Sequence, residues 1–257
     1  MKMRPGRARS ILESSIDSAL LAVEIYNKPR TFFRKEGYIT LMVMAWTKLL
    51  HADIYRKIGD KFYYKETNGK YKLVDGERKA WELKTCLKEI EKYDPLLLSE
   101  PLKANLKFFI GLRNKIEHRH LSKLEFENLI FGECQSLLYN YENILVKMFG
   151  EEYVLNENLA YALQFSQLRT KEQLHANKQI LSKEVVEIRK FIEEYRTVLT
   201  DSVFNSQEYS IKLIQIPKIS NTSRNDLAIE FVKWDELNIE DREKYEKLNV
   251  IIKDKKQ

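Results

Sequence analysis

The recurrence of apolar residues at helical spacing along most of the chain is the feature that most constrains its fold. The segment YITLMVMAW, residues 38–46, is apolar on most sides of a helix, so we expect a central, buried helix over residues 38–58. This run is about half as long as a membrane span requires, which favours a place in a protein core over membrane contact. The same spacing predicts further helices over residues 10–26, 78–93, from 101 into a polar cluster at 113–120, and over 122–148, 157–168 and 171–199.

Composition supports the same fold class. The 257 residues include only eight glycines and five prolines, which favours long helices over a turn-rich β fold, so the sequence predicts a mainly α protein. A net charge of +6 suits contact with phosphate. The two cysteines, Cys86 and Cys134, form no CxxC pattern. The basic N-terminal segment runs into an amphipathic pattern without a cleavable hydrophobic stretch, so we expect no signal peptide. We therefore expect a cytoplasmic protein.

One stretch changes period from helical to alternating. Residues 61–74, KFYYKETNGKYKLV, form two short aromatic runs joined by Asn68-Gly69, a pair that tolerates the positive φ angles of a type I′ turn, so we expect an inserted β-hairpin. Packing explains the alternating aromatics of a small hairpin. The basic and aromatic composition also suits stacking on single-stranded RNA, for which the candidate residues are Lys61, Tyr63, Lys65, Lys70 and Lys72.

Beyond residue 200 the pattern changes again. YSIKLIQIP and DLAIEFVKW are typical of strands around a polar loop, and a charged helix is expected over residues 239–253. We therefore expect two parts, a helical domain over residues 1–200 and a small α+β tail over residues 201–257.

The polar cluster follows an apolar helix and holds two of the four histidines of the chain. Its sequence, RNKIEHRH, resembles the R-x(4 to 6)-H motif of the HEPN superfamily (higher eukaryotes and prokaryotes nucleotide-binding). In that resemblance Arg113 matches the motif arginine, Asn114 matches the polar residue that follows it, and His118 matches the motif histidine. The fold implied for the helical domain is a HEPN-like helical bundle.

The resemblance also implies an activity. Members of this superfamily are commonly metal-independent endoribonucleases that need no cofactor and act as homodimers, with two copies of the motif facing each other. Many serve as toxins or in defence against phage. RNA and a second copy of the chain are therefore the implied partners, together with an antitoxin or sensor that restrains the activity.

The residue types suit this chemistry on their own. Metal-free RNA cleavage uses the 2′-hydroxyl as nucleophile, so it needs a group with a pKa near 6.5 to move a proton and a permanent cation to stabilise the charge on phosphorus. His118 and Arg113 are of these types, and Asn114 shares a helical face with His118. No metal-ligand spacing appears in the sequence. We expect supporting roles for Glu117, Arg119 and His120.

Other readings of the cluster remain. Arg113 and Glu117 have the spacing of a stabilising ion pair, with His118 favouring the negative end of the helix. The domain could accordingly be a non-catalytic module that binds RNA, a nucleotide or a protein, or a scaffold built on the long polar helix 171–199. A second match to the spacing, Arg169 and His175, falls in a polar linker without an apolar helix before it, so we set it aside.

Overall fold

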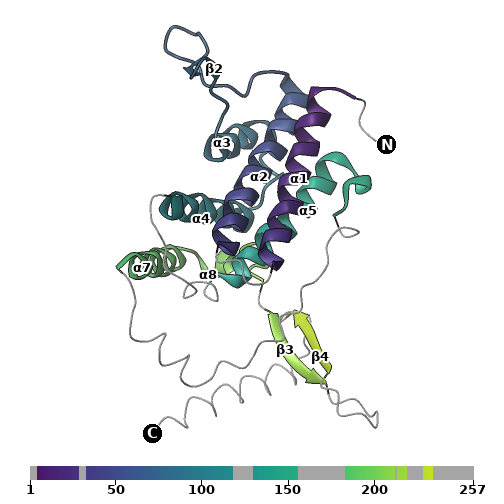
Figure 1. Ribbon diagram of the computed structural model, residues 1–257, viewed down its shortest axis with the longest axis vertical. Coiled ribbons are helices and arrows are strands. Elements are labelled where there is room, and N and C mark those ends of the chain that lie inside the picture. Colours follow the sequence, from purple (N-terminus) through teal and green to yellow (C-terminus); the bar gives the residue numbers. More distant parts are fainter. Residues whose placement is uncertain are drawn as a thin grey trace. The chain divides into compact units, whose positions relative to one another are not determined.

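The protein is mainly α-helical, with short antiparallel strand pairs, as the sequence predicts (Figure 1). A computed structural model describes residues 5–28, 33–117, 130–155, 183–211, 213–218 and 228–233. The chain divides into two compact units, Met1–Ser210 and Ile211–Gln257, which are described separately below. None of the helices that the structure describes combines the length and apolar character that crossing a lipid bilayer requires.

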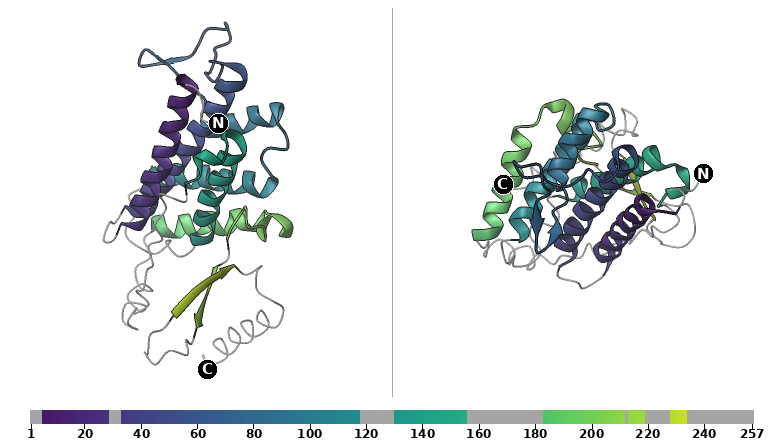
Figure 2. Two further views of the ribbon diagram at one scale, coloured as in Figure 1. Left: turned by 90° about the vertical axis from the view of Figure 1, so that its right-hand side faces the viewer. Right: turned by 90° about the horizontal axis from the view of Figure 1, so that it is seen from above.

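Helices α1 (Arg7–Asn27) and α2 (Arg34–Ile58) lie side by side along most of their length (Figure 2), and both confirm the predicted helices. Small residues allow the close approach. Ala19 and Ala22 of α1 are fully buried, and the buried Ser15 donates a hydrogen bond of 2.6 Å from Oγ to the carbonyl oxygen of Ala45 in α2. Through α2, the pair packs against the helices over residues 83–93, 100–117 and 131–149.

The other helices of the first unit complete its core. Trp46 of α2 is fully buried, donates from Nε1 to the carbonyl of Leu137 at 3.3 Å, and meets the ring of Tyr141 edge-on at 5.7 Å. These contacts connect the apolar helix predicted at residues 38–58 to the centre of the fold. The remaining elements are α3 (Leu83–Tyr93), α4 (Glu100–Glu117), α5 (Phe131–Phe149), η1 (Glu151–Tyr153), α7 (Lys183–Thr197) and α8 (Asp201–Phe204).

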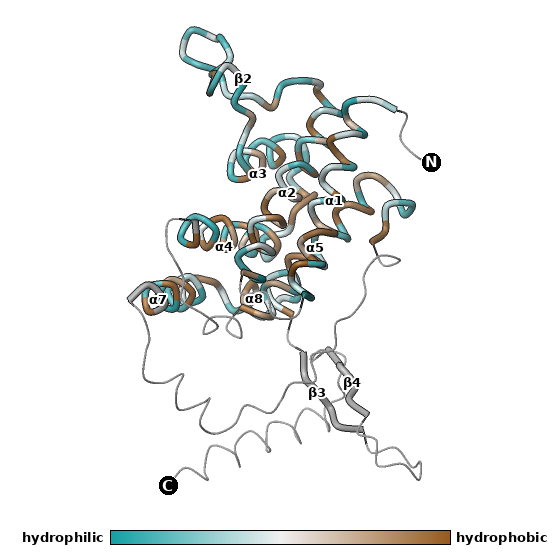
Figure 3. The backbone as a smooth tube through the Cα atoms, viewed as in Figure 1, coloured by the Kyte–Doolittle hydropathy of each residue, from teal (hydrophilic) through white to brown (hydrophobic). Residues whose placement is uncertain are grey.

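The inserted β segment is larger than predicted. Strands β1 (Leu73–Val74) and β2 (Glu77–Arg78) pair around Asp75 and Gly76, whose φ angles of 51° and 84° are those of a type I′ turn. The preceding run, residues 62–65, pairs with both arms through bridges between Tyr63 and Ala80 and between Lys65 and Tyr71. We call residues 61–82 the β module. It projects beyond the helices (Figure 1) and is largely hydrophilic at its tip (Figure 3).

Two expectations for this region are wrong. Asn68 does not adopt a positive φ, whereas Gly69 does at 80°, and the amide of Gly69 donates to the carbonyl of Glu66 at 2.9 Å. This turn is therefore not of type I′. The helix expected from residue 78 begins only at Leu83, because the backbone of residues 78–81 pairs with earlier residues of the β module. The amide of Trp81, for example, donates a hydrogen bond of 2.8 Å to the carbonyl of Phe62.

The second unit contains the two predicted strands. Strand β3 (Leu213–Lys218) pairs antiparallel with β4 (Ala228–Lys233), with Leu213 opposite Lys233. The helices predicted at residues 157–168 and 239–253 lie outside the described residues, as do the first parts of those predicted at 122–148 and 171–199.

Candidate functional site

Helix α4 carries the first part of the polar cluster. It begins directly after Ser99, whose Oγ accepts a hydrogen bond of 3.3 Å from the amide of Leu102, and Pro101 occupies the first turn, where its missing N–H costs nothing. Helical spacing predicts Leu102, Leu106, Phe109 and Ile110 on its inward face. The structure also buries Phe108, Leu112 and Ile116 there, together with the polar Asn105, and leaves Ile110 only partly buried. The buried apolar positions are Leu102, Leu106, Phe108, Phe109, Leu112 and Ile116.

These anchors fix where the motif residues lie. Leu112 is fully buried and Ile116 nearly so, on either side of Arg113 and Asn114. Arg113 is half-buried and Asn114 is exposed. The last turns of α4 thus carry one half-buried and one exposed polar residue at the boundary between core and solvent, and the helix ends at Glu117.

The rest of the cluster is outside the described residues. This applies to His118, Arg119 and His120, and to the second match at Arg169 and His175. Glu117 is described only as the last residue of α4. Of the motif residues, the structure therefore describes the side chains of Arg113 and Asn114, and the roles expected for all residues of the cluster stay predictions.

His51 is held by packing and by a hydrogen bond within the protein. Its ring stacks on Phe62 with 4.4 Å between centroids, and Nε2 lies 2.8 Å from the carbonyl oxygen of Trp81. Since a carbonyl can only accept, Nε2 donates and carries the proton of the neutral ring. Burial lowers the pKa of His51 to about 4, against a smaller opposing effect of the hydrogen bond to Trp81. At neutral pH this ring is uncharged and occupied in linking α2 to the β module.

The cysteines have no nucleophilic character. Both thiols are buried and neither forms a disulfide. Burial raises the pKa of Cys86 and of Cys134 to about 12, so the reactive thiolate is negligible at neutral pH. Among the residues that the structure describes, no group of three His, Cys, Asp or Glu side chains is arranged to hold a metal ion.

The β module divides the predicted RNA-binding residues between two faces. Residues directly opposite in an antiparallel pair share a face, and Lys65 lies opposite Tyr71. Tyr63 joins this face, since its ring lies 5.8 Å from that of Tyr71. Lys72, one residue along the strand from Tyr71, belongs to the other face. Lys61 and Lys70 are exposed.

Two arginines complete this face: Arg7, which belongs to the basic N-terminal segment of the sequence, and Arg78, which sequence reasoning did not single out. Arg78 lies with its guanidinium carbon 4.4 Å from the ring centre of Tyr71 and 6.0 Å from that of Tyr63. Arg7, from the first turn of α1, donates from Nη2 to the hydroxyl of Tyr63 at 2.7 Å. We call this set the basic aromatic face: Arg7, Tyr63, Lys65, Tyr71 and Arg78. The Asp75-Gly76 pair was the sequence signal that could have placed Arg78 on a strand.

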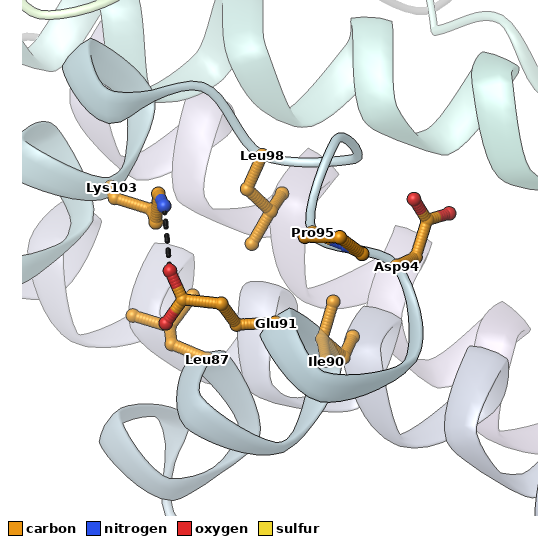
Figure 4. A pocket seen from close by; sticks show the side chains of 7 residues that line it. All are labelled: Leu87, Ile90, Glu91, Asp94, Pro95, Leu98 and Lys103. Atoms are coloured by element: carbon orange, nitrogen blue, oxygen red, sulfur yellow. Dashed lines mark hydrogen bonds and ion pairs between the residues drawn. The ribbon is translucent and has the colours of Figure 1, made fainter.

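A hollow between α3 and α4 is too small to be a ligand site (Figure 4). Its empty volume is about 160 Å³, part of which is open to solvent, whereas ligand pockets have roughly 300–1,000 Å³. Lys103, on its rim, donates to Glu91 at 2.9 Å and also pairs with Glu100. Ion pairing within the protein therefore occupies the polar groups of this hollow.

Polar side chains of α4 and α5 hold the segment that follows α8. Asn105 donates from Nδ2 to the carbonyl of Tyr209 at 2.7 Å, and Asn140 donates to that of Glu208 at 2.6 Å. Ser136 donates to the carbonyl of Gln207 at 2.7 Å. We call residues 207–209 the anchored segment. Its bond to Asn105 connects it to the helix that also carries Arg113.

Comparison with known proteins gives a family for the chain. A family model described as Domain of unknown function (DUF3644) matches residues 10–199, which is most of the sequence, so the chain belongs to this family. No curated protein and no solved structure matches it.

Proposed function

We propose that this member of the DUF3644 family is a metal-independent endoribonuclease whose active site contains Arg113, Asn114 and His118. The active form in this proposal is a homodimer, and the resemblance to the HEPN superfamily suggests a role as a toxin or in defence against phage. The observation that carries the proposal is the end of α4, where the half-buried Arg113 and the exposed Asn114 follow a helix whose inward face is packed into the core.

The packing of α4 supports the role of Arg113. Because Leu112 and Ile116 hold the last turns against the core, the backbone of Arg113 has a fixed position. A fixed backbone at this position limits the region that the guanidinium can reach, and a donor that starts close to its site costs less reorganisation when charge develops on a bound phosphate. Its planar donors also match two phosphate oxygens at once. Asn114, exposed beside it, is suited to donate a further hydrogen bond to the scissile phosphate.

The reaction that we propose is an internal transesterification. His118 takes the proton of the 2′-hydroxyl, the 2′-oxygen forms a bond to phosphorus, and the bond from phosphorus to the 5′-oxygen breaks. The leaving 5′-oxygen takes a proton from a second acid, which the facing copy of the chain supplies. The products are a 2′,3′-cyclic phosphate and a 5′-hydroxyl.

The environment of His51 narrows the choice of general base. A base that works at neutral pH needs a pKa near that pH and access to the substrate. His51 has neither, because burial lowers its pKa to about 4 and its ring is stacked on Phe62. This favours a histidine of the polar cluster.

The test is cleavage of total RNA in excess EDTA by the wild type, by His118→Ala and by His175→Ala, with chemical typing of the new 3′ ends. The proposal expects cyclic 2′,3′-phosphate ends from the wild type and from His175→Ala, which removes a histidine outside the motif, and none from His118→Ala.

Equal cleavage by His118→Ala and wild type would refute the proposed site. Absence of cleavage by all three proteins, each shown to be folded, would favour the non-catalytic binding module.

A further inference from the structure

We infer that Arg7 and Arg78 form a binding site for the phosphodiester backbone of single-stranded RNA on the basic aromatic face of the β module. The site deepens the proposed function, on which it rests, because it names the surface that holds the RNA and the chemical group recognised. Arg7 comes from the first turn of α1 and Arg78 from β2, so folding alone brings them together.

One carboxylate holds both arginines. Nη1 of Arg7 lies 3.2 Å, and Nη1 of Arg78 lies 3.5 Å, from the same Oδ2 atom of Asp60. Two cations that share one anion leave a net positive charge. The shared partner also fixes the two guanidiniums beside each other, which reduces the entropy lost when a polyanion binds both.

Aromatic rings orient the two guanidiniums. Arg78 lies over Tyr71 at 4.4 Å, and Arg7 lies over Tyr55 at 5.7 Å and donates to the hydroxyl of Tyr63. A stacked guanidinium uses its flat face for the ring and keeps its N–H groups at the edge. Both side chains are 50% exposed.

The remaining donors of Arg78 are available for a ligand. Within the described parts of the chain, Arg78 forms an ion pair with Asp60, and this pair involves Nη1 of Arg78. Nε and Nη2 have no acceptor there. These two groups form one side of the guanidinium fork, which is the side that donates two parallel hydrogen bonds to a phosphate.

The neighbours of Arg78 favour RNA over an acidic polypeptide. Leu73 lies directly opposite Arg78 in the strand pair, so it shares that face, and it is 58% exposed. Lys65 is exposed on the same face, with Nζ 5.7 Å from the ring centre of Tyr71. An unpaired RNA strand offers a flat base for apolar side chains beside every phosphate, whereas the acidic residues of a polypeptide offer charge without such a base.

The test measures binding of a fluorescent single-stranded RNA to the full-length chain by anisotropy at several salt concentrations. All proteins carry His118→Ala, so that cleavage cannot interfere. The test variant is Arg7→Gln with Arg78→Gln. The control is Lys92→Gln with Lys190→Gln, which removes two exposed cations that are each paired with a glutamate on their own helix.

The expected result is a loss of affinity of about tenfold at low salt in the arginine variant, with none in the control. The slope of log Kd against log salt should fall in magnitude by about 1.4, since each phosphate contact with a single strand contributes about 0.7. Equal affinity and slope in the arginine variant and the control would overturn the inference. Competition by polyglutamate as strong as that by unlabelled RNA would also overturn it, in favour of an acidic polypeptide.

Arg78→Lys provides a second variant should the double variant fail to fold, as judged by circular dichroism. It keeps the charge and removes the planar fork, so a smaller but measurable loss is expected, and unchanged binding would overturn the inference. The outcomes are separable from those of the proposed function. Cleavage by the wild type together with unaffected binding refutes only the arginine site, whereas arginine-dependent binding without cleavage refutes only the nuclease.

Discussion

The ring of Phe191 fills the space beside Gly111, so that a Cβ atom at position 111 would lie only 2.8 Å from Cζ of that ring. Phe108 stacks on the same ring at 5.9 Å, and the ammonium of Lys115 lies 5.1 Å from its centre. Phe191 therefore sets how closely α7 approaches α4, two residues before Arg113.

Gly111→Ala should destabilise the protein although alanine is the better helix former. The clash requires the ring of Phe191 or the helix that carries it to shift, at a cost of about 1–3 kcal/mol in the free energy of unfolding, measured by urea denaturation. Adding Phe191→Leu, which removes the ring atoms that clash, should recover part of this loss. A Gly111→Ala protein as stable as the wild type would contradict the packing described here.

Replacing Arg113 by lysine should lower the rate of RNA cleavage by about 10²-fold or more, because lysine keeps the charge and loses the two-pronged donation to phosphate. Asn114→Ala should also lower the rate. Since Asn114 is exposed, its replacement should change the free energy of unfolding by less than about 0.5 kcal/mol. The rate comes from single-turnover cleavage and the stability from urea denaturation. A parallel loss of stability would assign Asn114 a structural role instead.

His51 should make stability depend on pH. Its pKa is lowered to about 4 in the fold from an ordinary 6.5, so the unfolded chain binds a proton between these values that the folded chain does not. The stability contributed by this group is present above pH 6.5 and is lost as the pH falls towards 4, by at most about 3 kcal/mol. His51→Gln, which does not titrate, should flatten the dependence.

The check is the free energy of unfolding at neutral pH and near pH 4.5 for both proteins. Carboxylates titrate in both, so only the difference between them reports on His51. An equal change in the free energy of unfolding with pH for the wild type and His51→Gln would contradict the lowered pKa of His51.

Arg196→Met should destabilise the helical unit by about 3 kcal/mol. Arg196 donates from Nε and Nη2 to Oε1 of Glu133 at 3.0 and 2.6 Å, and Glu133 is only 2% exposed. Burial already raises the pKa of Glu133, and Arg196 opposes that effect. Removal of Arg196 leaves a buried carboxylate without its cation. The double variant with Glu133→Gln should be more stable than Arg196→Met alone in urea denaturation, and the opposite order would contradict this explanation.

Helical periodicity was enough to predict α1, α2, α4 and the body of α5, because burial of one face decides both the element and its orientation. It missed Phe108, which is fully buried because Phe191 and Tyr195 of α7 lie over it, at 5.9 and 5.4 Å between ring centroids. That contact comes from a distant part of the chain and leaves no local signal.

The β module shows the limit of local turn signals. The sequence contains both Asn68-Gly69 and Asp75-Gly76, and only the second forms the type I′ turn. The choice depends on how residues 62–65 pair with both following arms. The basic aromatic face could not be predicted either, since Asp60 joins Arg7 to Arg78 only once the fold exists. For the polar cluster, the role proposed for His118 comes from the sequence motif alone. The structure adds that Leu112 and Ile116 pack into the core on either side of Arg113 and Asn114.

Because of the anchored segment, the compact helical unit ends later in the chain than the match to the sequence family does. The family model ends at residue 199, whereas the buried amides of Asn105 and Asn140 find their acceptors at Tyr209 and Glu208. A chain shortened to the family boundary would lose these two hydrogen bonds, each of which contributes about 0.5–1.5 kcal/mol, together with the buried side chain of Tyr209. The compact helical unit accordingly extends to Ser210, and a fragment of this chain cut at residue 199 would lack the contacts that close the unit at this end.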